Sequence, residues 1–127
     1  MALPEHLKTG ARGEQLAARY LRDRGYEIFA SDFSTPLGET DIIAVSPDRT
    51  YCFIEVKTRA PGGMFPPSDA VDIPKQDRLI NNAAAFLTRY KIDSVSIRFD
   101  IIEVILHDLY TAEINHIEDA FGQETIR

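Results

Sequence analysis

The sequence predicts a mixed α/β (α+β) domain in which helices flank a central sheet. Two segments, residues 9–24 and 74–90, carry apolar side chains at helical spacing. Two others, residues 40–45 and 51–57, are apolar at successive positions, which is typical of central strands that are covered on both faces. Residues 94–106 alternate between apolar and polar side chains and add a long strand.

The first helix is expected at residues 9–24. Thr9 can cap its amino end, and Gly25 can end it in a left-handed conformation. Its apolar stripe consists of Leu16, Ala17, Tyr20 and Leu21. A short strand is expected at residues 26–30, followed by a loop at residues 31–38 that contains proline and glycine.

The two central strands are separated by residues 46–50, whose composition is typical of a turn. Residues 60–68 are rich in glycine and proline and are expected to form a loop. The second helix follows, with Pro74 at its first position. In the strand at residues 94–106, Asp100 is expected to face outward, and a final short strand is expected at residues 109–117.

Length and composition favour one domain over residues 1–127. The single cysteine, Cys52, excludes a disulfide framework and a CxxC metal site. The first residues contain no apolar signal core, and no apolar run approaches the roughly 20 residues that span a bilayer. These features predict a soluble, cytoplasmic protein.

The charge of the chain is unevenly distributed. A net charge of −6 argues against a simple nucleic-acid binder. Residues 100–127, however, contain seven of the 20 acidic residues and one of the 14 basic residues. The first 99 residues therefore have 13 of each sign and are neutral, and the acidity belongs to a C-terminal segment that begins at about residue 100.

Charged residues interrupt the two central strands: Asp41 in the first, Glu55 and Lys57 in the second. A hairpin centred on Asp48 places Asp41 opposite Glu55, with Cβ atoms about 4.5–5.5 Å apart, and Lys57 on the same face. A two-residue turn at residues 48–49 would instead turn Asp41 to the other face. The sequence leaves both registers open.

In the first register, two carboxylates repel each other in a partly buried place. The repulsion can be offset by protonation of one acid, by Lys57, or by a divalent cation between them. Hard oxygen ligands suit Mg²⁺ or Mn²⁺, which can polarise a phosphodiester and activate water. The alternative is a structural cluster of salt bridges without a metal.

The same residues carry a family resemblance. Residues 38–41, Gly-Glu-Thr-Asp, and 53–59, Phe-Ile-Glu-Val-Lys-Thr-Arg, resemble the YraN-like family of uncharacterised bacterial proteins. That family is similar to archaeal Holliday-junction resolvases and to the PD-(D/E)xK nuclease superfamily. The resemblance extends over most of the chain, from Gly13-Glu14 to Arg98-Phe99-Asp100.

The resemblance implies a restriction-endonuclease-like core, α-β-β-β-α-β, with a central mixed sheet. It implies catalytic roles for Asp41, Glu55 and Lys57. It also implies that Glu14, Asp41, Glu55 and the Val56 carbonyl hold Mg²⁺ or Mn²⁺. Resolvase relatives are commonly homodimers, so the resemblance also implies a dimer.

Two positions depart from the family pattern. Thr40 stands where the family usually has an apolar residue, and residues 31–34, Ser-Asp-Phe-Ser, replace a stretch with asparagine and arginine. Candidates for nucleic-acid contact are Arg59, which can clamp a phosphate, and Lys75 and Arg78, one helical turn apart. For these residues, ordinary surface positions are the alternative.

The sequence therefore predicts a metal-dependent endonuclease that acts on DNA, with branched or structured DNA as the substrate expected from the resolvase resemblance. The alternative is a non-catalytic module that binds nucleic acid or a partner and retains the nuclease fold.

Overall fold

The structure is a computed structural model that describes residues 5–60, 71–108 and 111–122, with side chains from residue 10 onward. The elements in these residues are α1 (Glu5–Asp23), β1 (Glu27–Thr35), β2 (Gly38–Val45), β3 (Tyr51–Arg59), α2 (Ile73–Arg89), β4 (Ile97–Leu106) and β5 (Ala112–Phe121). This order confirms the predicted mixed class, and the final strand, expected at residues 109–117, lies at Ala112–Phe121.

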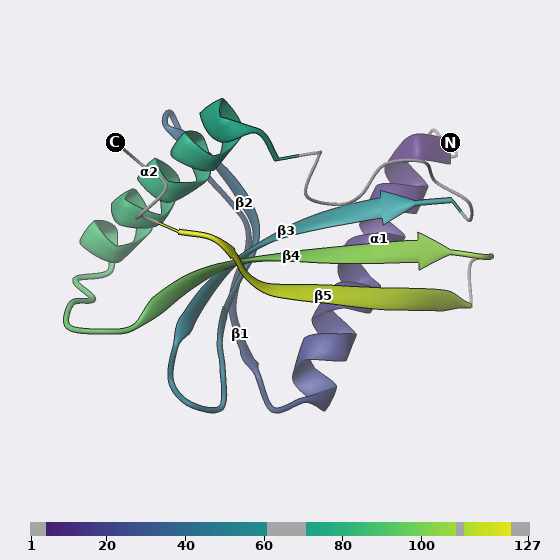
Figure 1. Cartoon of the computed structure of the whole chain (residues 1–127), viewed down its shortest axis with the longest axis horizontal. Helices are drawn as coiled ribbons and strands as arrows, with labels where there is room; N and C mark the ends of the chain where they lie inside the picture. Colours follow the sequence, from purple (N-terminus) through teal and green to yellow (C-terminus); the bar gives the residue numbers. More distant parts are fainter. Residues whose placement is uncertain (1–4, 61–70, 109–110, 123–127) are drawn as a thin grey trace.

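The five strands form one mixed sheet in the order β1-β2-β3-β4-β5. Neighbouring strands are antiparallel except β3 and β4, which are parallel and are joined through α2. Figure 1 shows the two helices on either side of the strands. A parallel pair requires such a crossover because its strands run in the same direction.

Each helix covers its own face of the sheet. Ala17 and Leu21 of α1 are fully buried against one face, and Leu79, Ile80, Ala83 and Phe86 of α2 are buried against the other. Alternate residues of the central strands enter the two cores, as Ile42 and Ile43 do on β2. The successive apolar positions in β2 and β3 thus reflect burial on both faces.

Several predicted boundaries were wrong. The first helix begins at Glu5 rather than Thr9. The loop predicted at residues 31–38 is mostly strand, because β1 continues to Thr35 and pairs with β2 in a tight hairpin that buries Phe33. β4 begins at Ile97, three residues later than predicted, after a positive φ of 58° at Ser94. The loop predicted at residues 60–68 lies, except for its first residue, outside the described part.

The register of the β2–β3 hairpin is the first of the two open alternatives. Ile42 pairs with Ile54 and Val45 with Tyr51, so Asp41 and Glu55 are the residues that face each other just beyond the last pair. Ser46 closes the turn, since its backbone N–H donates to Thr50 O at 2.9 Å and its hydroxyl accepts from Thr50 N at 3.1 Å. This five-residue turn excludes the two-residue turn that would reverse the facing of Asp41.

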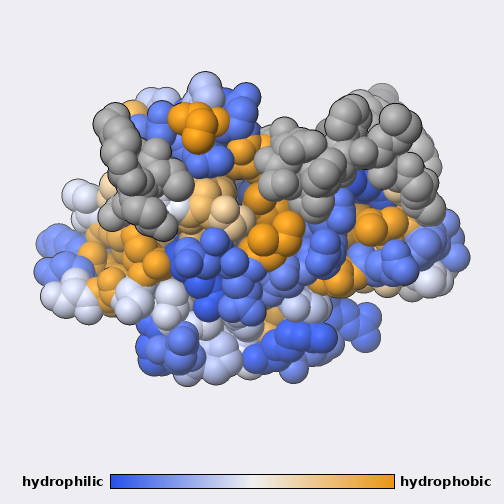
Figure 2. Space-filling view, in the orientation of Figure 1, coloured by the Kyte–Doolittle hydropathy of each residue, from blue (hydrophilic) through white to orange (hydrophobic). Residues whose placement is uncertain are grey.

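The pairing of β2 with β3 stops at Ile42 and Ile54, whereas β3 stays paired with β4 as far as Arg59. Asp41 and Glu55 therefore lie where β2 and β3 part. On the face shown in Figure 2, apolar patches are separated by hydrophilic residues. Neither helix of the described residues is long and apolar enough to cross a membrane.

Candidate active site: an acid cluster beside two lysines

Asp41 and Glu55 meet at the point where β2 and β3 separate. A backbone N–H of β3, that of Val56, donates to Asp41 Oδ2 at 2.8 Å. The carboxyl group of Glu55 lies close enough to that of Asp41 to raise the pKa of Asp41. The structure thus brings these two predicted residues together, with Glu55 only 8% exposed.

Two more acids reach the same place from other elements. Carboxylate oxygens of Glu14 on α1, Asp32 on β1 and Asp41 on β2 all lie within 4.8 Å of one another. Two oxygens that bind one Mg²⁺ at about 2.1 Å can be at most about 4.2 Å apart, so a slight contraction would give ligand spacing. The donor set is entirely carboxylate oxygen, which fits Mg²⁺ or Mn²⁺. We call Glu14, Asp32, Asp41 and Glu55 the acid cluster.

Gly13 brings α1 close enough for Glu14 to join. A Cβ atom at this position would lie 1.9 Å from Thr58 Oγ1 on β3. Only a residue without a side chain allows this approach. Asp32 joins through an unusual backbone conformation, a φ of 51°, which aspartate tolerates better than most residues.

Burial and mutual repulsion raise the pKa of two of these acids. Burial is the main cause for Asp41, and the nearby carboxyl group of Glu55 adds to it, so its pKa rises to about 8. Burial also leads for Glu14, followed by the charge of Asp32 and a hydrogen bond with it, and the pKa rises to about 7. The cluster therefore holds protons at neutral pH that a bound cation would displace.

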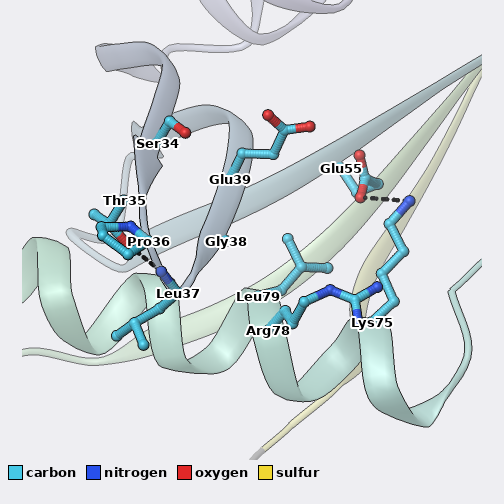
Figure 3. A pocket seen from close by; sticks show the side chains of 10 residues that line it. All are labelled: Ser34, Thr35, Pro36, Leu37, Gly38, Glu39, Glu55, Lys75, Arg78 and Leu79. Atoms are coloured by element: carbon cyan, nitrogen blue, oxygen red, sulfur yellow. Dashed lines mark hydrogen bonds and ion pairs between the residues drawn. The ribbon is translucent and has the colours of Figure 1, made fainter.

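Two lysines face the acids. Lys75 Nζ on α2 lies 3.2 Å from Glu55 Oε2, and this pair is drawn in Figure 3. Lys57 lies beside Lys75. Burial lowers the pKa of Lys57 and the contact with Lys75 lowers it further, whereas the contacts with Lys57 and Glu55 raise the pKa of Lys75 despite its burial. Of the two lysines, Lys75 therefore has the higher pKa and holds its proton more tightly.

Arg59 and Arg78, the other two residues predicted to contact nucleic acid, differ in their partners. Arg59 forms an ion pair with Glu103 of β4, with 2.8 Å between Nε and Oε2. Arg78 is exposed on α2 and pairs with no carboxylate of the described residues. The roles proposed for these residues and for the Val56 carbonyl stay predictions.

A cavity of about 510 Å³ adjoins the acid cluster. Its walls are the β1–β2 hairpin from Ser34 to Glu39 and the first turns of α2, and Glu55 also lines it. Figure 3 shows Lys75 and Arg78 on the α2 wall and Glu39 across from them.

Sequence reasoning missed Asn82, which joins α2 to the hairpin. This fully buried amide donates to Phe33 O at 3.1 Å and to Thr40 Oγ1 at 3.0 Å, and it accepts from Thr35 Oγ1 at 2.7 Å. These bonds account for the polar residue at position 40, next to Asp41. A polar residue inside the apolar stripe of the second helix was the available signal.

A second buried polar cluster lies beneath α1. Asp100 was predicted to face outward, but it is only 1% exposed. It accepts from Arg98 Nε at 3.1 Å and from the backbone N–H of Asp119 at 2.9 Å, and it bonds His116 Nε2 at 2.8 Å. The prediction was wrong because α1 covers the face of β4 that alternation assigned to solvent. We call Arg98, Asp100 and His116 the Asp100 cluster.

The part of the chain that contains the acid cluster matches a family of known sequences. Residues 13–104, which include all four acids and both lysines, match the model of Uncharacterised protein family UPF0102. The chain belongs to this family. A UPF0102 protein of Alkaliphilus oremlandii is 44% identical over 117 residues, which cover 90% of this chain and 97% of that protein.

Other UPF0102 relatives are similar over nearly the same length. That of Pelobacter propionicus is 38% identical over 94% of this chain and 86% of its own, and that of Caldanaerobacter subterraneus is 39% identical over 89% and 93%. The UPF0102 match begins at Gly13, the residue that brings α1 against β3. It ends within β4, before β5.

Proposed function

We propose that this protein is a metal-dependent endonuclease that hydrolyses phosphodiester bonds of DNA. The observation that carries the proposal is the meeting of four carboxyl groups from α1, β1, β2 and β3 beside Lys57 and Lys75. A structural salt-bridge cluster would balance its charges, but here the acids outnumber the lysines and retain protons instead. That imbalance favours a site for a divalent cation.

The residues that would hold Mg²⁺ or Mn²⁺ are Glu14, Asp41 and Glu55, with the Val56 carbonyl and Asp32 as further oxygen ligands. The ion supplies Lewis-acid polarisation of a phosphate oxygen and favours ionisation of a water molecule. The N–H of Val56 holds the Asp41 carboxylate in place through a hydrogen bond of 2.8 Å. Such support orients a ligand before the cation arrives.

Lys57 would orient the attacking water or neutralise charge that develops on the phosphate. Burial and the neighbouring Lys75 lower its pKa, which makes the ammonium a better proton donor than an ordinary lysine. Lys75, which keeps its charge, would release Glu55 to the cation and turn toward the substrate phosphate.

Branched or structured DNA is the substrate we propose, and a homodimer the assembly, both from the resolvase resemblance. The acidity of the chain is a weaker objection than its net charge suggests. Asp100 and Glu118 pair with Arg98, and Glu103 pairs with Arg59, so two arginines offset part of the charge of these C-terminal acids.

The alternative is a binding module without catalysis. The ion pair between Lys75 and Glu55 favours it, because a lysine that permanently holds Glu55 leaves the acid cluster one ligand short. The same pair would then serve to fix α2 against β3.

Cleavage assays distinguish the two. Junction, flap and single-stranded DNA are incubated with Mg²⁺, Mn²⁺ or EDTA. For the enzyme, metal-dependent cleavage is expected, and Asp41→Asn and Lys57→Ala each reduce its rate at least 100-fold. Glu27→Gln is the matched control, because Glu27 is 76% exposed at the side chain and, among the described residues, forms its ion pair with the exposed Arg49.

The wild type and the control should cut alike. Binding that survives both changes, with no cutting by the wild type, would support the module instead. Cutting that persists with EDTA or in Asp41→Asn would contradict the metal-dependent mechanism.

A further inference from the structure

The cavity beside the acid cluster has the chemistry of a nucleotide site. One wall is cationic, with Lys75 and Arg78 on successive turns of α2. The opposite wall is the hairpin tip, where Leu37 is 52% exposed. A cavity lined by an exposed apolar side chain and by two cations offers one surface for a base and one for a phosphate.

The cavity is held open by internal contacts. Asn82 fixes both strands of the hairpin to α2, and the backbone N–H of Leu37 donates to Thr35 Oγ1 at 3.1 Å. At Gly38 the hairpin approaches α2 so closely that a Cβ atom would lie 2.9 Å from Arg78 O. A ligand would therefore enter a preformed site and cost little ordering.

Charge orients an anion within the cavity. Glu39 and Glu55 repel a phosphate from the sheet side, whereas Arg78, which has no acidic partner among the described residues, attracts it to the α2 side. A guanidinium can bind phosphate through two parallel hydrogen bonds.

Volume limits what can enter. At about 510 Å³, the cavity is within the range of about 300–1,000 Å³ that is usual for small-molecule sites. It can hold one or two unpaired nucleotides, but a stacked and paired duplex is far too wide. The strand that enters must therefore be single-stranded at this point.

We propose that the cavity binds an unpaired nucleotide of the substrate strand, with its phosphate on Lys75 and Arg78 and its base against Leu37. This inference rests on the proposed function and narrows its substrate to DNA with a single-stranded segment beside the bond that is cut. A blunt, fully paired duplex would leave the cavity empty and bind more weakly.

The test measures binding of a fluorescent oligothymidylate and of a blunt duplex of equal length by anisotropy, with Ca²⁺ in place of Mg²⁺ to prevent turnover. Arg78→Ala and Leu37→Ser are each expected to weaken oligothymidylate binding 5- to 30-fold and to change duplex binding less than twofold. Leu37 is aliphatic, so the loss from Leu37→Ser should lie near the lower end of this range, since stacking of a base on an aromatic side chain is stronger.

Matched controls are Arg22→Ala, an exposed arginine on α1, and Ile73→Ser, an exposed apolar residue of α2 that does not line the cavity. Both should bind like the wild type. Thermal melting confirms that the exposed substitutions leave the fold intact. Equal losses on duplex and single strand, or no loss on either, would overturn the inference.

Cleavage by the same variants separates this inference from the proposed function. If Asp41→Asn abolishes cutting but Leu37→Ser cuts flap and duplex substrates like the wild type, the nucleotide site is refuted and the nuclease stands. If oligothymidylate binding depends on Leu37 and Arg78 but nothing is cut, the site stands and the nuclease is refuted.

Discussion

Asp41 on β2 and Asp100 on β4 are both carboxyl groups held inside the protein, but their partners differ. Asp100 is surrounded by donors: the Arg98 guanidinium, His116 and a backbone N–H. Asp41 has one backbone donor, and the charges that raise its pKa are those of the neighbouring acids Glu55 and Glu14. Burial tends to raise the pKa of both, but the hydrogen bonds of Asp100 outweigh burial and lower its pKa, whereas that of Asp41 rises to about 8.

The difference separates a structural cluster from a candidate site. The Asp100 cluster satisfies its own charges and needs nothing from outside. The acid cluster leaves negative charge uncompensated as soon as its protons leave, and a cation can stabilise that state. Perturbed carboxyl groups of this second kind are the ones that gather at functional sites.

The largest loss of stability that we expect from a substitution is at Asp100. Asp100→Asn should lower the free energy of unfolding by about 3–5 kcal/mol, because it removes the buried carboxylate that pairs with Arg98 and leaves that cation only the exposed Glu118. Asp41→Asn should not lower it in EDTA, because it removes like-charge repulsion. Urea unfolding followed by circular dichroism measures both, and equal losses would remove the distinction.

The next effect is stabilisation by metal. Mn²⁺ at 100 times its dissociation constant should raise the free energy of unfolding by about 2.7 kcal/mol. The gain should vanish in Asp41→Asn and persist in Glu27→Gln. Urea unfolding with Mn²⁺ and with EDTA measures the gain, and an equal gain in both variants would point to adventitious binding elsewhere.

Gly13→Ala tests how α1 delivers Glu14 to the acid cluster. Its Cβ would overlap the Thr58 hydroxyl, so a loss of about 1–3 kcal/mol and weaker Mn²⁺ binding are expected. Thr58→Ala in the same chain should recover part of both, since it removes the overlapping hydroxyl. Gly10→Ala is the control on the same helix, because nothing lies within 4 Å of its Cβ. Identical behaviour of the two alanine variants would contradict this role for Gly13.

The pH dependence of stability distinguishes the two buried carboxyl groups by its direction. In the unfolded chain Asp41 and Glu14 ionise near their ordinary pKa values of 3.8 and 4.5, but in the folded protein near 8 and 7. The folded state therefore binds more protons between these limits, and its stability in EDTA should fall as pH rises from about 4 to 8. Asp100 contributes with the opposite sign, since its lowered pKa gives stability that is lost only as pH falls below its unfolded value.

Urea unfolding at several pH values compares the wild type with Asp41→Asn. The decline should be shallower in the variant, where each pKa unit removed corresponds to about 1.4 kcal/mol. Parallel curves would mean that Asp41 is ionised in the folded protein, and the proton-holding cluster would be refuted.

The sequence predicted the parts of this site that depend on local pattern. The order of elements followed from periodicity. Whether Asp41 and Glu55 lie on the same face depended on the length of one turn. The sequence was compatible with two lengths, and the hydrogen bond from Ser46 N–H to Thr50 O shows which of them the protein has.

What could not be predicted depends on contacts between distant segments. The ion pair of Lys75 with Glu55 joins α2 to β3, and the bond of His116 with Asp100 joins β5 to β4. Asp32 was hidden because the strand was expected to end at Ala30, two residues too early to place it beside Asp41. Alternation along residues 94–106 was visible, but it could not reveal that α1 covers the polar face.

The central claim is that the acid cluster binds a divalent cation, and Mn²⁺ titration by calorimetry tests it most directly. One binding event per chain is predicted at about pH 7.5, with protons released to the buffer. It should weaken strongly at about pH 5.5 and disappear in Asp41→Asn but not in Glu27→Gln. No heat of binding at about pH 7.5, or equal binding by Asp41→Asn, would contradict the account.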